Sequence, residues 1–329
     1  MTNDHAPFVE NVFDLEVEEG AYAVDGIEGE VPGWLRGSYY LNGPALFGRA
    51  GRRYRHWLDG DGLVTALHFR AEGVQAVHRY VRSTKFVDET LEGKLLYRAF
   101  GTAFEGDRLK RGIGLESPAN VSAYRFGDVL LAFGEQGLPW ELDPITLETH
   151  GEHTFGGRLN AISPLSAHPC FDPESGEMVN FGISFAAHQP SLTLYRFRHD
   201  GELLMRRRLP IDYPCSVHDF GLSPNHAIFY LSPYLLDVER LIREGATLME
   251  ALVWEPERGS QLVIAARETG EKQATISLEG KYCLHLINSF EEDGKLIVDV
   301  VELDRPVYDQ YEVVPDLFTE VEPGRPCAS

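Results

Sequence analysis

Short segments of alternating or continuous apolar character, joined by glycine-containing turns, run through most of this chain. Representative segments are AVHRYVRSTKFV, VSAYRFGDVLLAF, HAIFYLSPYLL and KLIVDVVEL, which are rich in β-branched and aromatic residues. Turn signals lie at residues 59–62, 127–128, 199–201 and 293–294. Turns of this kind between alternating segments are typical of β-hairpins. The sequence therefore predicts an all-β protein, built as a sandwich, a barrel or a propeller.

Two stretches have helical character. Residues 235–250 place apolar side chains at helical spacing, and Gly245 interrupts the pattern. A weaker helical pattern covers residues 91–104. The chain contains neither a clear repeat of 40 to 50 residues nor a linker, so we expect one domain over residues 1–329.

Charge and cysteine content narrow the classes of function. The formal net charge is −21 over 329 residues, which argues against a nucleic-acid partner because Lys and Arg provide most of that binding. The acidic N-terminal residues lack the regions of a signal peptide, and no apolar run reaches the ~18 residues that span a bilayer. Four widely spaced cysteines without a C-x-x-C pair favour a reduced, cytoplasmic protein.

Three of the twelve histidines share a sequence context that the others lack. His168, His218 and His285 each end or interrupt an apolar run, and each is followed by a small turn and another strand. Their separations exclude a zinc finger or an H-E-x-x-H site, whose ligands come from one local element. In a radial β fold, however, the inner strands converge on one axis, and histidines from successive units could meet at a metal. Neutral imidazoles suit iron, copper and zinc.

A metal site of this kind needs a carboxylate close to the imidazoles, because a metal-bound histidine normally donates its other ring N–H to a carboxylate or carbonyl group. Glu135, which follows the apolar run VLLAF, is the best candidate. Gly134 and Gly137 lie on either side of it, so an ordinary turn residue is the competing interpretation.

The run RYRHWLDGDGLVTALHF, residues 53–69, contains two closely spaced acidic residues but lacks the other ligands of a calcium-binding loop. We interpret it as a tight hairpin, with His56 and His68 in structural roles.

Several ordered runs resemble the carotenoid cleavage oxygenase family, and together they extend from about residue 31 to residue 319. These runs are VPGWLRGSYYLNGPALF, YRHWLDGDGLVTALHF, RSTKF, LLAFGE, ELDPITLETHG, AHPCFDPESGE, VHDFGLSPNHAIF and HLINSFEEDGKLIVDVVELDRP. The resemblance implies a seven-bladed β-propeller, with residues 1–30 as an N-terminal arm and residues 31–329 as blades. It also implies an oxidoreductase that uses Fe(II) and O2 to split a C=C bond of a carotenoid or apocarotenoid into two carbonyl products.

In this family four histidines hold the iron, and glutamates orient three of them. The resemblance implies that His168, His218 and His285 are the first three metal ligands and that Glu135 orients the third. It implies no catalytic residue beyond the ligands, and an apolar polyene as substrate.

The fourth family histidine has no counterpart here, since no histidine follows His285. We therefore expect an incomplete propeller, with the missing blades supplied by the remainder of a longer gene product or by a second chain. His188 and His226 are poor substitutes for the missing ligand, because His226 occupies a structural position in NHAIF and His188 lies in the loop-like run AAHQPS.

Three alternatives remain at this stage. The chain could cleave stilbenes, although those relatives tend to carry Lys directly before the glutamate, where this chain has Gly134. It could be a degenerate member that binds carotenoids without catalysis. A sugar-binding or hydrolytic propeller is weaker, because no convincing carboxylate pair can be assigned. The apolar stretch at residues 230–242 could contact a membrane surface or belong to the core.

Overall fold

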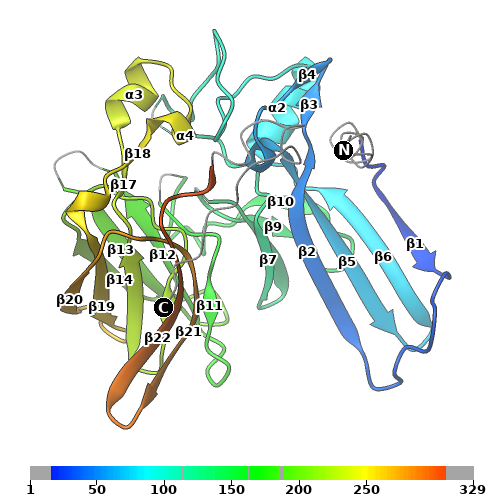
Figure 1. Ribbon diagram of the computed structural model, residues 1–329. Coiled ribbons are helices and arrows are strands. Elements are labelled where there is room, and N and C mark those ends of the chain that lie inside the picture. Colours follow the sequence, from blue (N-terminus) through cyan, green and yellow to red (C-terminus); the bar gives the residue numbers. More distant parts are fainter. Residues whose placement is uncertain (1–15, 113, 136, 162, 186–188, 309–329) are drawn as a thin grey trace, which may run out of the picture.

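The chain folds into β-sheets that lie beside one another in a curved row (Figure 1). The computed structural model describes residues 16–308 except 113, 136, 162 and 186–188. Within these residues, four four-stranded antiparallel sheets are followed by a two-stranded hairpin. The all-β prediction is therefore confirmed.

Each four-stranded sheet is formed mainly by strands that follow one another in the sequence. The first sheet, of order β1-β6-β5-β2, contains β1 (Gly20–Val24), β2 (Gly37–Leu46), β5 (Asp61–Arg70) and β6 (Gly73–Tyr80). The second contains β7 (Ser122–Phe126), β8 (Val129–Phe133), β9 (Trp140–Leu142) and β10 (Thr149–Glu152). The third contains β11 (Cys170–Phe171), β12 (Met178–Ser184), β13 (Ser191–Phe197) and β14 (Leu203–Pro210). The fourth contains β15 (Gly221–Leu222), β16 (His226–Leu231), β19 (Ser260–Ala266) and β20 (Lys272–Leu278).

Three smaller pairs of strands complete the described β structure. They are β3 (Gly48–Arg49) with β4 (Arg52–Arg53), β17 (Tyr234–Leu236) with β18 (Leu252–Trp254), and β21 (Tyr282–Glu292) with β22 (Lys295–Leu303). β2 lies beside β7, and β15 lies beside β21. Strands at the inner edges of neighbouring units thus lie side by side, which brings segments that are distant in the sequence close together.

The core lies between successive sheets. In β8, Leu130 and Ala132 pack toward the first sheet, whereas Leu131 and Phe133 pack toward the third. All four are at most 1% exposed. A strand buried on both faces has a continuous apolar sequence rather than an alternating one, which explains the run VLLAF.

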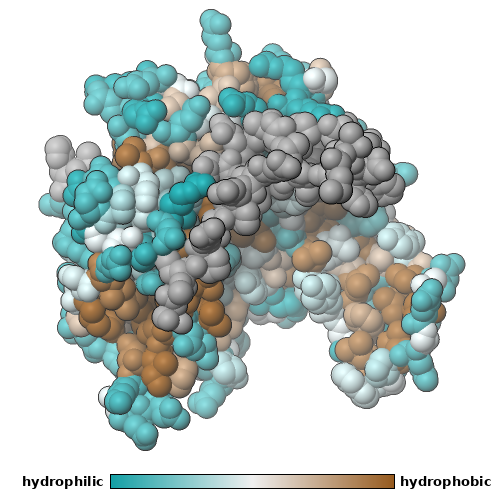
Figure 2. All heavy atoms as spheres, in the orientation of Figure 1, coloured by the Kyte–Doolittle hydropathy of each residue, from teal (hydrophilic) through white to brown (hydrophobic). Residues whose placement is uncertain are grey.

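The two ends of the row differ from its middle. In the first sheet, Val64 and Ala66 are buried against the second sheet, whereas Tyr39 and Leu41 on β2 are each 58% exposed. In the terminal hairpin, Ile287 and Val301 are also exposed. In Figure 2, apolar surface is visible on the first sheet at the right and on the sheets and hairpin at the left, with a hollow between the two parts.

Most of the predicted turns are confirmed. Residues 127–128 join β7 to β8, residues 199–201 lie between β13 and β14, and residues 293–294 join β21 to β22. Asp293 and Gly294 have φ angles of 50° and 72°. Positive φ at both central residues is the requirement of a type I′ hairpin turn.

The hairpin predicted at residues 59–62 is wrong. Asp59 ends a 3-10 turn and Asp61 begins β5, and both carboxylates are buried. Asp61 accepts hydrogen bonds from Lys85 Nζ at 2.7 Å and Arg49 at 2.8 Å, and Asp59 accepts one from Thr102 Oγ1 at 2.6 Å. These partners are distant in the sequence, so a local pattern could not distinguish the buried ion pairs from an exposed turn.

The helices agree only partly with the sequence pattern. Residues 235–250 contain two short helices, α3 (Val238–Arg243) and α4 (Leu248–Ala251), and the break between them includes Gly245 at a φ of 77°. The helix predicted at residues 91–104 is wrong, because α2 spans Thr84–Glu92 and ends at Gly93. The Ser83 side chain caps α2 by accepting from the Phe86 N–H, a capping signal that the apolar spacing did not reveal.

The structure also bears on the expected N-terminal arm and on the apolar segment at residues 230–242. β1 pairs with β6 as the outer strand of the first sheet, so the expected N-terminal arm of residues 1–30 contains a strand of that sheet. Most apolar residues of the segment 230–242 are buried or half-buried, and Ile242 is 37% exposed. Leu236 and Leu241 of that segment belong to a small core cluster with Ala251. Among the described residues, no helix is both long and apolar enough to cross a bilayer.

Candidate metal centre

Three histidines predicted from the sequence to act together lie in one cluster. His168 precedes β11, His218 precedes β15, and His285 lies within β21. Each occupies the first strand of its unit or the loop leading into it. The convergence of these strands toward the centre of the row brings together side chains that are 50 and 67 residues apart in sequence.

An irregularity in the last hairpin positions the third histidine. The pairing of β21 with β22 shifts register between Cys283 and Leu286, so His285 lies in a bulge. Bulges bend a strand and redirect its side chains, and they are common beside functional sites. Gly221 on β15 permits the hairpin to approach, because a Cβ there would lie 2.6 Å from Ser289 Oγ.

The three imidazoles face one another through their Nε2 atoms. The Nε2 of His218 lies 2.8 Å from that of His168 and 3.1 Å from that of His285. Metal–nitrogen bonds of about 2.1 Å meeting at right angles would separate two such nitrogens by about 3.0 Å. His168 and His218 are half-buried, whereas His285 is exposed. The donor set therefore fits a single metal ion that prefers imidazole ligands.

Glu135 lies in the loop after β8 and contacts the cluster. Its Oε2 lies 3.1 Å from Nδ1 of His218, and its Oε1 lies 4.0 Å from Nε2 of His168. The expectation that Glu135 orients His285 is therefore wrong, since the loop meets the second histidine. Which imidazole the loop would meet depends on how the sheets are stacked, and local sequence does not encode that.

Burial and neighbouring charges set the protonation of the cluster. Burial, reinforced by His218, lowers the pKa of His168 to about 4 and also lowers the pKa of His285. Burial opposes charge on His218, but Glu135 raises its pKa. Burial would raise the pKa of Glu135, and the adjacent His218 lowers it overall. Two imidazoles are thus held neutral, as metal ligation requires, and His218 is paired with a carboxylate.

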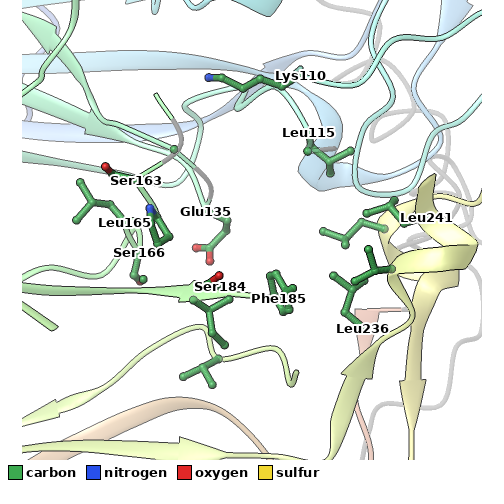
Figure 3. A pocket seen from close by; sticks show the side chains of 18 of the residues that line it. Lys110, Leu115, Glu135, Ser163, Leu165, Ser166, Ser184, Phe185, Leu236 and Leu241 are labelled. Carbon is green, nitrogen blue, oxygen red and sulfur yellow. The ribbon is translucent and has the colours of Figure 1, made fainter. Parts of the chain in front are cut away.

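The histidines form part of the wall of an apolar cavity of about 670 Å³. A second cavity of about 520 Å³ shares lining residues with it, and Figure 3 shows Leu241 of α3 on its wall. Side chains that line both cavities include Leu115, Glu135, Ile183, Phe185 and Val217. Apart from Glu135, sequence reasoning identified none of these lining residues, because they are single apolar residues from separate loops and strands.

The remaining sequence candidates lie outside the cluster. His56 and His68 are buried and bond the backbone carbonyls of Tyr308 and Ile145, which confirms their structural roles. His226 Nδ1 lies 2.9 Å from Glu291 Oε1 and takes no part in the cluster. His188 lies outside the described residues.

A row of four-stranded sheets whose inner ends bring three histidines together defines a β-propeller with a candidate metal centre. Residues 12–323 match the family described as Retinal pigment epithelial membrane protein, and the chain belongs to this family, the carotenoid oxygenases. Its solved members are seven-bladed propellers, so the predicted fold class is confirmed. Cobalt-substituted Synechocystis ACO aligns with a TM-score of 0.87 and 31% sequence identity, over 98% of this chain and 69% of that chain.

Curated relatives include enzymes with different named substrates. Apocarotenoid-15,15'-oxygenase of Synechocystis sp. is 34% identical over 88% of this chain and 61% of its own length. Isoeugenol monooxygenase of Pseudomonas putida is 33% identical over 89% of this chain and 58% of its own length. Resveratrol cleavage oxygenase 1 of Aspergillus fumigatus is 30% identical over 88% of this chain and 57% of its own length. The chain thus spans about three fifths of the length of these relatives.

Proposed function

We propose that this chain carries the substrate cavity and three of the iron ligands of an Fe(II)-dependent oxygenase that cleaves a C=C bond of a carotenoid or apocarotenoid. The observation that supports this most directly is the convergence of the Nε2 atoms of His168, His218 and His285 at the wall of an apolar cavity. In this proposal the three imidazoles hold Fe(II), and Glu135 orients His218 through its Nδ1 atom.

The chain's own contributions are binding, orientation and exclusion of water. Bound Fe(II) would supply the activation of O2, and each O atom would end in one of the two carbonyl products, so that atoms balance. The apolar walls formed by Leu115, Phe185 and Val217 suit a linear polyene, since a hydrocarbon chain needs no hydrogen-bond partners. Neutral imidazoles add no charge to that of the iron, and the carboxylate of Glu135 lies beside His218.

Packing at Gly134 supports a polyene over a phenolic stilbene. A Cβ at this position would lie 2.0 Å from Ser117 Oγ. A lysine directly before Glu135, the residue that would meet a phenolic hydroxyl group, therefore has no room unless Ser117 moves. Stilbene cleavage is the second candidate, because the relatives include resveratrol cleavage oxygenase 1.

We also propose that further propeller blades, from the same polypeptide or a second chain, cover the exposed faces at the two ends of the row. Tyr39 and Leu41 on β2 and Ile287 and Val301 on the last hairpin are large apolar side chains left exposed at those ends. A fourth histidine from these blades would complete the ligand set. Binding of a purified C-terminal propeller segment from a family member, with a rise in iron affinity, would be the expected result.

Metal content and oxygen consumption test the main proposal. The wild-type protein, reconstituted anaerobically with Fe(II), is compared with the His168→Ala and His285→Ala variants. We expect both variants to lose most of the bound iron. The His199→Asn variant, in which an exposed histidine away from the cluster is replaced, should retain it. Wild-type iron content in both alanine variants would refute the site. Stoichiometric iron without O2 uptake on any apocarotenoid, with or without added blades, would refute the activity.

A further inference from the structure

Side-chain to backbone hydrogen bonds connect the three chain segments that carry the clustered histidines. These bonds do not involve the imidazole rings. Two side chains supply these bonds, Ser166 and Asp219. Neither is a member of the imidazole cluster, and each bonds backbone groups of two segments or residues beside it.

Ser166 connects the first histidine to the second. Its hydroxyl group accepts a hydrogen bond from the backbone N–H of His168 at 3.1 Å and donates one to the carbonyl oxygen of His218 at 2.9 Å. The residue is only 4% exposed. Its own N–H donates to the Phe181 carbonyl oxygen at 2.6 Å, and its carbonyl oxygen accepts from Asn180 Nδ2 at 3.0 Å. The bridge is therefore fixed to β12.

Asp219 connects the second histidine to the third. Its Oδ1 accepts from the Phe220 N–H at 2.8 Å, and its Oδ2 accepts from the Leu286 N–H at 3.0 Å. Leu286 directly follows His285 and lies at the edge of the β21 bulge. A carboxylate that accepts two backbone N–H groups forms stronger bonds than a neutral acceptor would. The bulge that carries His285 is thus held to the segment that carries His218.

We propose that Ser166 and Asp219 are positioning residues that together set the separation of the three imidazoles. Ser166 bonds the backbone of both His168 and His218. Asp219, which directly follows His218, bonds the backbone N–H beside His285. This inference rests on the proposed metal site, but it concerns the backbone between the ligands rather than their chemistry. Other hydrogen bonds also join these segments, such as those of Glu291 to the fourth sheet, but the bonds of Ser166 and Asp219 act within two residues of the imidazoles that they position.

Cobalt binding provides the test, because Co2+ absorption reports both affinity and ligand geometry. The Ser166→Ala and Asp219→Asn variants are titrated with Co2+ beside two controls of the same residue types whose hydrogen bonds lie away from the cluster. Ser191→Ala removes a buried hydroxyl group that accepts from Arg208 Nε at 2.7 Å, and Asp212→Asn alters a carboxylate that accepts from Gln261. Unfolding by urea without metal is measured for all variants.

We expect the two positioning variants to bind Co2+ about tenfold to a hundredfold more weakly than wild type, the range seen for residues that orient metal ligands. Their visible spectra should change, the controls should stay within twofold of wild type, and Ser166→Thr should restore the Ser166→Ala loss. Co2+ affinity within twofold of wild type in both variants would overturn the proposal, as would an equal loss in the controls. If one variant does not fold, the other decides, because each removes a separate link.

A failure of the metal site itself is recognised separately. If wild-type protein binds no Co2+, the proposed function fails. The imidazole 15N resonances of the metal-free protein then test whether Ser166 and Asp219 position the histidine rings. We expect those of the clustered histidines to shift in Ser166→Ala and Asp219→Asn but not in Ser191→Ala. Unshifted imidazole resonances in both Ser166→Ala and Asp219→Asn would overturn the positioning proposal.

Discussion

The second sheet and the first sheet have the same size and topology class but different surroundings. In the second sheet, β8 buries both faces, with Leu130 and Leu131 pointing to opposite neighbours and each fully buried. In the first sheet, β2 buries one face and leaves Tyr39 and Leu41 exposed on the other. The terminal hairpin resembles the first sheet in this respect. A sheet in this fold is thus stabilised on both sides only where it has two neighbours.

The candidate metal centre spans this difference. His168 and His218 extend from sheets with two neighbours, whereas His285 extends from the terminal hairpin, and its side chain is exposed. Hydrogen bonds at Asp219 and Glu291 attach that hairpin to the fourth sheet. The third ligand is therefore the exposed member of the cluster and the one carried by the hairpin at the end of the described row.

The largest expected effect is in the doubly packed region. Phe181 is 1% exposed and packs against Phe220 and Phe229 with ring centroids 5.3 Å away in each case. Replacing Phe181 by Ala should destabilise the protein by about 3–5 kcal/mol, the usual loss for a buried aromatic side chain. Urea unfolding monitored by fluorescence measures this. A loss below 1 kcal/mol would show that the core between sheets tolerates cavities.

A smaller effect is expected where the hairpin meets the fourth sheet. Replacing Gly221 by Ala would place a Cβ 2.6 Å from Ser289 Oγ and 3.2 Å from Leu286 Cδ2, so the hairpin must shift. We expect a loss of about 1–3 kcal/mol in unfolding free energy together with weaker Co2+ binding. Gly43→Ala on β2 is the matched control, since nothing lies within 4 Å of a Cβ there. Unchanged Co2+ affinity would show that the hairpin position does not control the cluster.

The hydrogen-bonded carboxylate of Glu291 in the hairpin should make stability depend on pH. Hydrogen bonds from Ser223 and Asn225 lower the pKa of Glu291 to about 2, from an ordinary value of 4.5. Its contribution is therefore complete above about pH 4.5 and is lost as the pH falls toward 2. Glu291→Gln should cost about 1–2 kcal/mol at pH 7, and urea midpoints should show the gap to wild type narrowing at pH 3. An equal gap at both values would contradict the assignment.

The smallest effect is expected on the open face of the first sheet. Leu41→Ser should change the unfolding free energy by no more than about 0.5 kcal/mol, because the side chain is 58% exposed. The same substitution in a complex with further blades should weaken their binding. A loss above 1.5 kcal/mol in this chain alone would show that the face is already covered in solution.

Sequence patterns predicted the features that depend on local chemistry. Apolar runs gave the strands, the Asp293-Gly294 pair gave a tight turn, and Gly245 marked the break between α3 and α4. The three histidines were selected by a shared context, and the structure groups them. Each of these signals lies within a few residues of the feature that it predicts.

Features that depend on distant partners were missed. The carboxylates of Asp59 and Asp61 appeared to belong to an exposed turn, because their partners Thr102 and Lys85 are far along the chain. Glu135 was assigned to the wrong histidine for the same reason. Ser166 and Asp219 carried a weak signal, as polar residues within two positions of a candidate ligand, but their backbone partners could be seen only in three dimensions.

The stacking of sheets also orders events in time. The second and third sheets are made of strands that follow one another, the first and fourth are interrupted by one short strand pair each, and the second, third and fourth sheets each pack against the sheet made just before. His285 is synthesised about 120 residues after His168, which takes roughly 6–24 s at 5–20 residues per second. During that interval the first histidine can already be held on its folded sheet while the third does not yet exist. We therefore expect a nascent chain to gain its metal affinity in one late step, when the last hairpin emerges from the ribosome.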